Sequence, residues 1–265
     1  MKRLIVTGDD FGLSLGVNDA IERAHRDGIL NTTSLMIAEP AASDAVRRAR
    51  ALPTLNVGLH IALVRARPML PPSEVPSLVD ANGMFATNLT LAGMRFFFSR
   101  SARRQLDAEI RAQFEAFRAT GLRLDHVNAH SHMHVHPTLL ASILRIGRDY
   151  AVRAVRVPFE PFVSWRTVVV EPWARLLRSR LRKAGIAHND FIFGIHNTGH
   201  MTTERVLTIL RDLPDGVSEI YFHPDDSAAG RAELVALTDA RVVAALADLG
   251  IEGVAFSDLV VANRA

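Results

Sequence analysis

Short apolar runs alternate along this chain with longer segments in which apolar residues recur every three or four positions. The short runs have the length of buried strands, and the longer segments have the period of amphipathic helices. Strands are predicted at residues 4–6, 34–37, 56–63, 124–128, 154–157, 191–193, 217–222 and 253–257. Helices are predicted at residues 14–28, 42–51, 103–120, 137–149, 201–213 and 232–249.

Strands that alternate with helices indicate βαβ units and a parallel sheet. The number of units and the length of 265 residues fit a (β/α) barrel, so we expect an α/β fold with a distorted, TIM-like barrel of about seven strands. No internal repeat or low-complexity linker marks a boundary, and residues 1–265 are predicted to form a single catalytic domain. Residues 64–102 form a long insertion of the kind that serves as a lid or a binding wall.

Histidines are concentrated in residues 125–137, which hold five of the eleven in the chain. In an extended backbone, side chains two residues apart share a face. An extended segment would therefore align His126, Asn128, His130, His132, His134 and His136. Imidazole groups buried without partners are costly, whereas imidazole is a common metal ligand and the usual acid or base at neutral pH. The row predicts metal or acid–base chemistry.

Other polar groups follow predicted strands, where the ends of parallel strands gather at one rim. Asp9 and Asp10 follow the first strand, His60 lies near the end of the third, and His223 ends the seventh. One carboxylate and two imidazoles can bind a divalent cation and leave positions open for water and substrate. A second acid can then accept a proton from water, and a histidine can protonate a leaving group. Because neighbouring side chains in a strand alternate in direction, we expect Asp9 and Asp10 to have different tasks.

Composition narrows the chemistry and the partners. The chain has no cysteine, so a metal would be held by imidazole nitrogen and carboxylate oxygen. The formal charge is +3, and acids and bases are mixed along the helices, which argues against nucleic-acid binding. The apolar run near the N-terminus is too short for a signal peptide, and no apolar run in the sequence reaches the length of a membrane span. The protein is expected to be cytoplasmic.

Two stretches combine aromatic with basic residues. They are residues 96–98, which are Phe-Phe-Phe, and residues 165–183, which include Trp165, Trp173 and a basic run that ends at Lys183. The basic run fits a solvated helix face. It also fits peripheral contact with an anionic or lipid-bearing interface at the cytoplasmic side of a membrane. An amphipathic substrate or a homodimer interface would each explain the apolar residues.

Three motifs resemble those of a known family. Residues 7–12 (Thr-Gly-Asp-Asp-Phe-Gly), 58–60 (Gly-Leu-His) and 128–134 (Asn-Ala-His-Ser-His-Met-His) are similar to signatures of the YdjC-like carbohydrate deacetylases. The resemblance implies a metal-dependent enzyme on a (β/α) barrel. Residues 125–130, the helix at 104–120 and the chain length most resemble the subgroup associated with hopanoid biosynthesis. That likeness implies an N-acetylglucosaminyl hopanoid lipid as substrate.

The resemblance also implies roles for individual residues. Asp10, His60 and His130 would hold one divalent metal ion, Mg²⁺ or Zn²⁺, with Asp9 as general base and His223 as general acid. Many members carry Asp where this chain has Asn128, and an amide is better suited to orienting an imidazole than to binding the metal. The remaining histidines are described together. His132 and His134 are expected to support the ligands or contact substrate, His126 and His136 to point away or lie in the flanking loop, and His188, His196 and His200 to be loop or rim residues.

The sequence thus favours a metal-dependent N-deacetylase that hydrolyses the linear amide bond of an N-acetylated amino sugar, either small or lipid-linked. Two alternatives remain open from the residues alone. A metal-dependent phosphoesterase also uses histidines and aspartates in a barrel, but with two or three metals and more carboxylates. A metal- or sugar-binding module would keep the site without turnover, although it would need no base such as Asp9.

Overall fold

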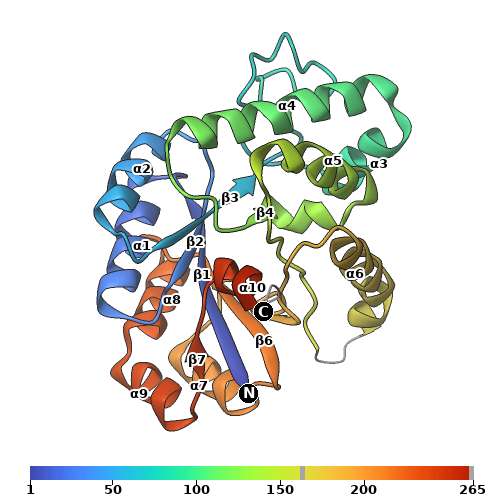
Figure 1. Cartoon of the computed structure of the whole chain (residues 1–265). Coiled ribbons are helices and arrows are strands. Elements are labelled where there is room, and N and C mark those ends of the chain that lie inside the picture. Colours follow the sequence, from blue (N-terminus) through green and yellow to red (C-terminus); the bar gives the residue numbers. More distant parts are fainter. Residues whose placement is uncertain (162–164, 263–265) are drawn as a thin grey trace.

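A seven-stranded parallel sheet forms the centre of the molecule (Figure 1). The computed structural model describes residues 1–161 and 165–262. The strands are β1 (Lys2–Phe11), β2 (Thr32–Leu35), β3 (Asn56–Ile61), β4 (Val127–Ala129), β5 (Phe191–Phe193), β6 (Gly216–Phe222) and β7 (Glu252–Gly253). Their order is β4-β3-β2-β1-β6-β5, and β7 pairs with β1. The long β1 therefore lies at the middle, where both of its faces are covered.

The α/β class and the parallel sheet are as predicted, and the described strands form a curled half-barrel. Beyond β4, single parallel bridges join Val127 to Val155 and Ala154 to Ala187. Closure into a TIM-like barrel is not shown by these pairings. The strand predicted at 154–157 is present only as these bridges, because its residues pair at single positions rather than along a ladder.

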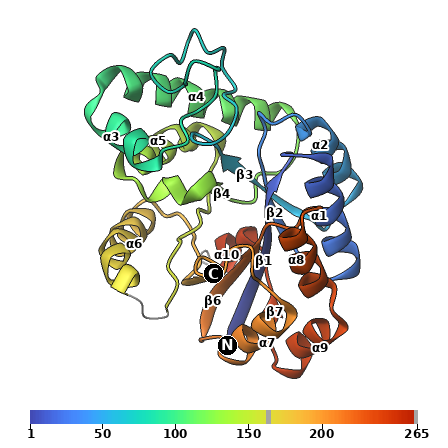
Figure 2. The ribbon, with the colours of Figure 1, turned by 180° about the vertical axis from the view of Figure 1, so that it is seen from behind.

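Helices cover the outside of the sheet, with α1, α2 and α8 on one side and α6 on the other (Figure 1, Figure 2). Their bounds are α1 Leu15–Asp27, α2 Ala42–Ala51, α3 Leu89–Phe98, α4 Arg100–Ala119, α5 Pro137–Gly147, α6 Trp165–Lys183, α7 Thr203–Arg211, α8 Ala228–Thr238, α9 Ala240–Asp248 and α10 Phe256–Ala262, with 3-10 turns η1 His130–Val135 and η2 Arg148–Tyr150. Five of the described α-helices begin after a residue whose side chain accepts a backbone amide of the first turn, as Ser14 does before α1. None of the helices in the described part of the chain is both long and apolar enough to cross a membrane.

Two predicted elements near the C-terminus were wrong in extent. The helix predicted at 232–249 is divided into α8 and α9, because the Asp239 carboxylate accepts the Arg241 amide at 2.9 Å and caps a new helix. The strand predicted at 253–257 ends at Gly253, because Phe256 begins α10 and buries its ring in the core.

The insertion at 64–102 is a packed segment that includes α3. Val75, Leu78 and Phe85 are buried in it. The Glu109 carboxylate on α4 accepts the amides of Met69 and Leu70 at 2.7 and 3.0 Å. These contacts attach the insertion to the helix layer, and α3 faces the end of the sheet where β4 turns into η1.

Candidate active site

Two adjacent carboxylates occupy the carboxyl end of β1. The β1–β2 register shifts between Gly8 and Phe11, and Asp10 has a φ of +66°. A left-handed residue interrupts the alternation of side chains, as a bulge does. Asp9 and Asp10 consequently both approach His60 instead of pointing to opposite faces. The bulge, which the strand pattern did not predict, lets neighbouring acids serve one site with different partners.

Asp10 forms a compact group with His60 and His130, which we call the metal group. Its Oδ1 lies 3.2 Å from His60 Nε2 and 3.0 Å from His130 Nδ1, and the two nitrogens are 3.4 Å apart. Ligand atoms about 2.1 Å from one cation lie roughly 3.0 to 3.4 Å from each other in octahedral and tetrahedral sites. These are the three residues in the described chain whose ligand atoms cluster in a group suited to a metal. The group is compatible with one divalent cation.

The hydrogen bonds around His60 direct a lone pair into this group. Asn128 Nδ2 donates to Asp9 Oδ1 at 3.1 Å, which leaves Asn128 Oδ1 to accept from His60 Nδ1 at 2.6 Å. His60 Nδ1 then carries the proton, and in the neutral ring Nε2 is unprotonated. An unprotonated nitrogen 3.2 Å from a carboxylate oxygen is repelled by it unless a cation or proton lies between them. The donor set therefore fits a metal.

Asp9 belongs to a buried ionic network instead of the metal group. Arg156 Nη1 and Nη2 donate to its two carboxylate oxygens at 2.5 and 3.0 Å, and Ser34 Oγ donates at 2.6 Å. Burial alone would raise the pKa of Asp9, but the Arg156 guanidinium outweighs it and holds that pKa well below its usual range. Asp9 is therefore ionised at neutral pH, as a proton acceptor must be.

Glu219 occupies the other side of the guanidinium. Arg156 Nε and Nη2 donate to it, the shortest bond being 2.6 Å, and Thr7 Oγ1 donates at 2.6 Å. Both side chains of this pair are fully buried. The single cation of Arg156 thus holds two carboxylates, one of which faces the site.

His223 follows β6 and lies beside the same network. Its amide donates to the buried Glu233 carboxylate at 2.5 Å, and its ring packs edge-on against Tyr221 with centroids 5.4 Å apart. His223 is also among the groups whose electrostatic interaction lowers the pKa of Asp9. Burial raises the pKa of the Tyr221 hydroxyl, which stays protonated and contacts Thr198 Oγ1 at 3.1 Å.

The prediction that the histidine row is extended was wrong beyond Ala129. The chain turns at His130 into η1, where Ser131 and His132 both have a φ of +53°. Only Asn128 and His130 reach the metal group. His132 Nε2 lies 3.3 Å from the Tyr221 hydroxyl, and the buried His134 donates from Nε2 to the Arg156 carbonyl at 3.0 Å.

The other histidines lie apart from the metal group. His126 is buried against Phe256 and bonded to Asp125 at 2.9 Å, and His136 packs against Phe96 and Phe97. His196 lies 3.9 Å from Glu160 in the loop after β5, which also holds His200. His188 lines a cavity elsewhere on the molecule.

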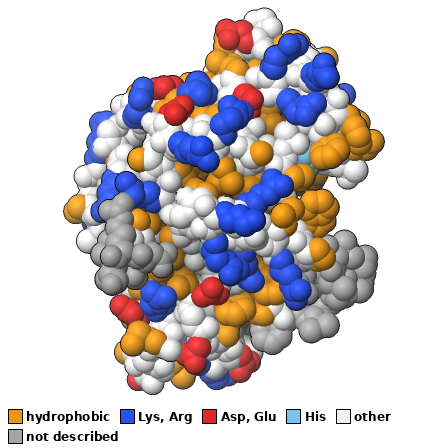
Figure 3. Space-filling model, turned by 45° about the vertical axis from the view of Figure 1, so that its right-hand side comes forward, with side chains coloured by type: hydrophobic (Ala, Val, Ile, Leu, Met, Phe, Trp, Pro, Cys, Tyr) orange, Lys and Arg blue, Asp and Glu red, His pale blue; other side chains and the backbone are white. Residues whose placement is uncertain are grey.

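An apolar groove of about 660 Å³ begins at His132 and His136. The walls of this groove, which we call the apolar groove, include α3 and the middle of α6. Its most exposed apolar side chains are Phe98 (72%), Met94 (54%), Phe97 (51%) and Trp173 (48%). Hydrophobic side chains gather along the right-hand edge of the molecule in Figure 3. An apolar surface therefore leads away from the site.

Sequence reasoning missed Arg156 and Glu219. Each is a charged residue inside an apolar run, in Val-Arg-Val at 155–157 and Val-Ser-Glu-Ile at 217–220. A charge in a buried strand needs an opposite charge, so two such positions signal an ion pair. That signal was available, but it did not show that the pair also holds Asp9.

Comparisons with known proteins each match most of this chain. A family model described as YdjC-like protein matches residues 3–248. A carbohydrate deacetylase of Brevibacillus brevis is 33% identical over 269 residues, covering 97% of this chain and 99% of that protein. A carbohydrate deacetylase of Geobacillus stearothermophilus is 31% identical over 267 residues, covering 96% of each. A solved structure of an Enterococcus faecalis protein named for cellobiose-phosphate cleavage superposes with a TM-score of 0.81 at 27% identity, covering 97% and 98% of the two chains.

Proposed function

Because this chain belongs to the YdjC-like family, we propose that it is a metal-dependent deacetylase that hydrolyses the N-acetyl group of an amino sugar. The observation that carries the proposal is the group formed by Asp10, His60 and His130, with the separate carboxylate of Asp9 beside it. One carboxylate is available to hold a cation and the other to accept a proton.

Asp10, His60 and His130 would hold the cation. Zn²⁺ and Mg²⁺ are the ions that we consider first for this nitrogen and oxygen donor set. A divalent cation there would lower the pKa of a bound water and polarise the acetamide carbonyl. Asn128 keeps His60 in the tautomer that offers Nε2, since its amide bridges His60 and Asp9. Because the amide is neutral, it adds no second negative charge beside Asp9.

The proton transfers are assigned to Asp9 and His223. Asp9 accepts a proton from water as the water oxygen bonds to the acetamide carbon. The carbon–nitrogen bond then breaks as His223 donates a proton to the departing amine, and acetate and a free amino sugar result. Arg156 and Ser34 keep the Asp9 carboxylate oriented and ionised, while Glu233 positions the backbone that carries His223. His132 and His134 support Tyr221 and the Arg156 backbone.

The finer proposal is that the substrate is lipid-linked, as in an N-acetylglucosaminyl hopanoid. The apolar groove supports it, because exposed Phe97, Phe98 and Trp173 line a surface that reaches His132. Burying one such aromatic side chain against a ligand is worth about 1.5–3 kcal/mol, or roughly ten- to a hundredfold in affinity. A sugar alone would gain little from these side chains.

Acetate release tests the proposed chemistry. The protein is depleted of metal, reloaded with Zn²⁺, Mg²⁺, Mn²⁺ or Co²⁺, and given N-acetylglucosamine conjugates with and without an apolar aglycone. We expect metal-dependent acetate, lost in His60→Ala and reduced about a hundredfold or more in Asp9→Asn and His223→Ala. His196→Ala also removes an imidazole, but from the loop after β5, and it should retain activity.

The lipid-linked substrate has its own test. Phe98→Ser should lower kcat/KM about tenfold or more for the apolar conjugate and leave the methyl glycoside unchanged. Leu249→Ser removes an exposed apolar side chain far from the groove and should change neither. An equal loss on both substrates in Phe98→Ser would count against the lipid.

Two other outcomes would replace the proposal. Two or three bound metals with release of phosphate from esters, but no acetate, would establish a phosphoesterase. One metal and bound sugar without turnover would establish a binding module.

A further inference from the structure

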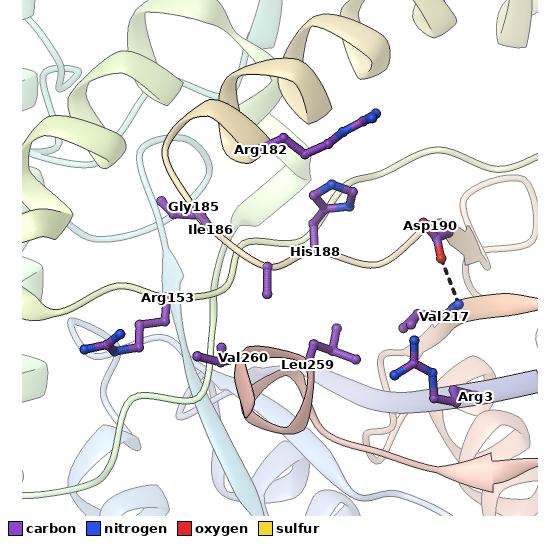
Figure 4. Close-up of a pocket in the computed structure, with 11 residues that line it drawn as sticks. Arg3, Arg153, Arg182, Gly185, Ile186, His188, Asp190, Val217, Leu259 and Val260 are labelled. Carbon is purple, nitrogen blue, oxygen red and sulfur yellow. Dashed lines mark hydrogen bonds between the residues drawn. The ribbon is translucent and has the colours of Figure 1, made fainter. Parts of the chain in front are cut away.

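A second cavity lies at the opposite end of the strands from the metal group. It has a volume of about 510 Å³ and is shown in Figure 4. Arg3 lines it near the start of β1, whereas Asp9 lies six residues further along the same strand. At about 3.3 Å per residue, the cavity is roughly 20 Å from the metal group. It is therefore separate from the proposed active site and from the apolar groove.

Basic side chains surround this cavity. Arg3, Arg153 and Arg182 line it, and none of the three forms an ion pair with an acidic residue of the described chain. The acid that lines it, Asp190, has its Oδ2 bonded to the Val217 amide at 2.9 Å. The lining therefore includes three arginines and one carboxylate that is already bonded to the backbone. In Figure 4, Arg3 and Arg153 lie on opposite sides of the cavity, and Arg182 lies above His188.

His188 lines the cavity beside these arginines. Its Nδ1 donates to the Asn189 carbonyl at 2.9 Å, so Nε2 is the atom left to meet a ligand. Burial lowers the pKa of His188 and the charges of Arg178 and Arg182 lower it further, whereas the bond to the Asn189 carbonyl and the charge of Asp190 raise it. A neighbouring anion would counter those charges and favour the protonated ring.

The floor of the cavity is apolar. Ile186, Ala187, Val217 and Leu259 form it, and the last three are buried. Guanidinium groups bind phosphate oxygens through two parallel hydrogen bonds, and an apolar floor suits the organic part of an ester. A purely electrostatic surface would not need such a floor.

We propose that this cavity binds a phosphate-bearing organic molecule, with the phosphate held by arginines of the rim and by His188 and the organic part on the apolar floor. Such a phosphate belongs to a soluble ester or to a lipid headgroup. The proposal is independent of the deacetylase assignment, since no residue of that site lines this cavity.

Binding of phenyl phosphate to the full chain tests the proposal by calorimetry, with inorganic phosphate as a second probe. Arg182→Gln should weaken phenyl phosphate binding about tenfold, the loss expected for one charge-assisted contact. Arg180→Gln is the matched control, because it removes the same charge from the same helix outside the cavity. Binding should also raise the pKa of His188, followed by NMR of its ring. Deacetylase activity should be unchanged in both variants.

A vesicle assay separates the two sources of phosphate. Binding to phosphatidylcholine vesicles that contain phosphatidylglycerol, lost in Arg182→Gln and not in Arg180→Gln, would identify a lipid headgroup. Binding of phenyl phosphate without vesicle binding would identify a soluble ester. Failure to bind either probe or the vesicles, or an equal loss in Arg180→Gln, would overturn the proposal.

Discussion

Arg156 provides the most demanding test of the buried network. The change Arg156→Met keeps much of the side-chain length but removes the cation that lies between Asp9 and Glu219. All three side chains are at most 3% exposed, so water cannot replace the lost charge. Two carboxylates are then left buried without their shared partner.

Removing one member of a buried ion pair costs about 3–5 kcal/mol, because the remaining charge keeps its desolvation penalty. For a chain of this size, 1 kcal/mol corresponds to about 2–4 °C in Tm. We therefore expect Arg156→Met to lower Tm by roughly 6–20 °C. Activity should fall as well, because Asp9 loses the group that orients it.

The loss of stability in Arg156→Met should depend on pH, and the pKa of Asp9 gives the direction of that dependence. In the native protein the pKa of Asp9 is depressed, so its contribution to stability is present above its unfolded value of about 4 and lost as the pH falls through the folded one. Without Arg156, burial would raise that pKa, and the buried charge would be neutralised by a proton in mild acid. The difference in Tm between Arg156→Met and the parent should therefore be smaller at pH 5 than at pH 8, as measured by scanning calorimetry.

Arg241→Met is the matched control. Arg241 also holds two carboxylates, Asp239 and Glu204, but it is well exposed, and water screens exposed ion pairs so that they add little to stability. If Arg156→Met lost no more stability than Arg241→Met, or lost more at pH 5 than at pH 8, the reasoning about Arg156 would be refuted.

Three further outcomes are expected. Asn128→Leu should weaken Zn²⁺ binding about ten- to a hundredfold in competition titrations, because His60 loses the bond that sets its tautomer; unchanged affinity would contradict this. Gly58→Ala should lower the free energy of unfolding, measured with denaturant, by about 1–3 kcal/mol, because the added Cβ would lie 2.4 Å from His126 Cε1. Asp125 has a lowered pKa in spite of its burial, so Asp125→Asn should flatten the loss of stability between about pH 5 and 3; an unaltered slope would exclude Asp125 as its source.

The sequence predicted the elements whose signals are local. The period of apolar residues identified α2 at its observed bounds and α4 to within a few residues. It failed at Asp239, where a capping residue divides a pattern that continues on both sides. Residues 154–157 look like a strand, but whether they form a ladder depends on neighbours that come from elsewhere in the chain.

The histidine-rich segment shows a different limit. Alternation predicted a single face, yet Ser131 and His132 adopt left-handed backbone conformations that no alternation reveals. The same holds at Asp10, where a bulge brings two neighbouring acids to one site. Both turns depend on contacts with distant strands, since Asp10 meets His60 and His130 only in the folded sheet.

By itself, the sequence determined the chemistry available to this protein: imidazole and carboxylate ligands without thiolates, carried at the ends of parallel strands. Those properties follow from residue types and from the period of the backbone. Only the tertiary structure decided which carboxylate joins the histidines and which is held by Arg156. That choice depends on side chains from β1, β3, β4 and the segment around Arg156 meeting within about 3 Å, a distance that sequence spacing does not determine.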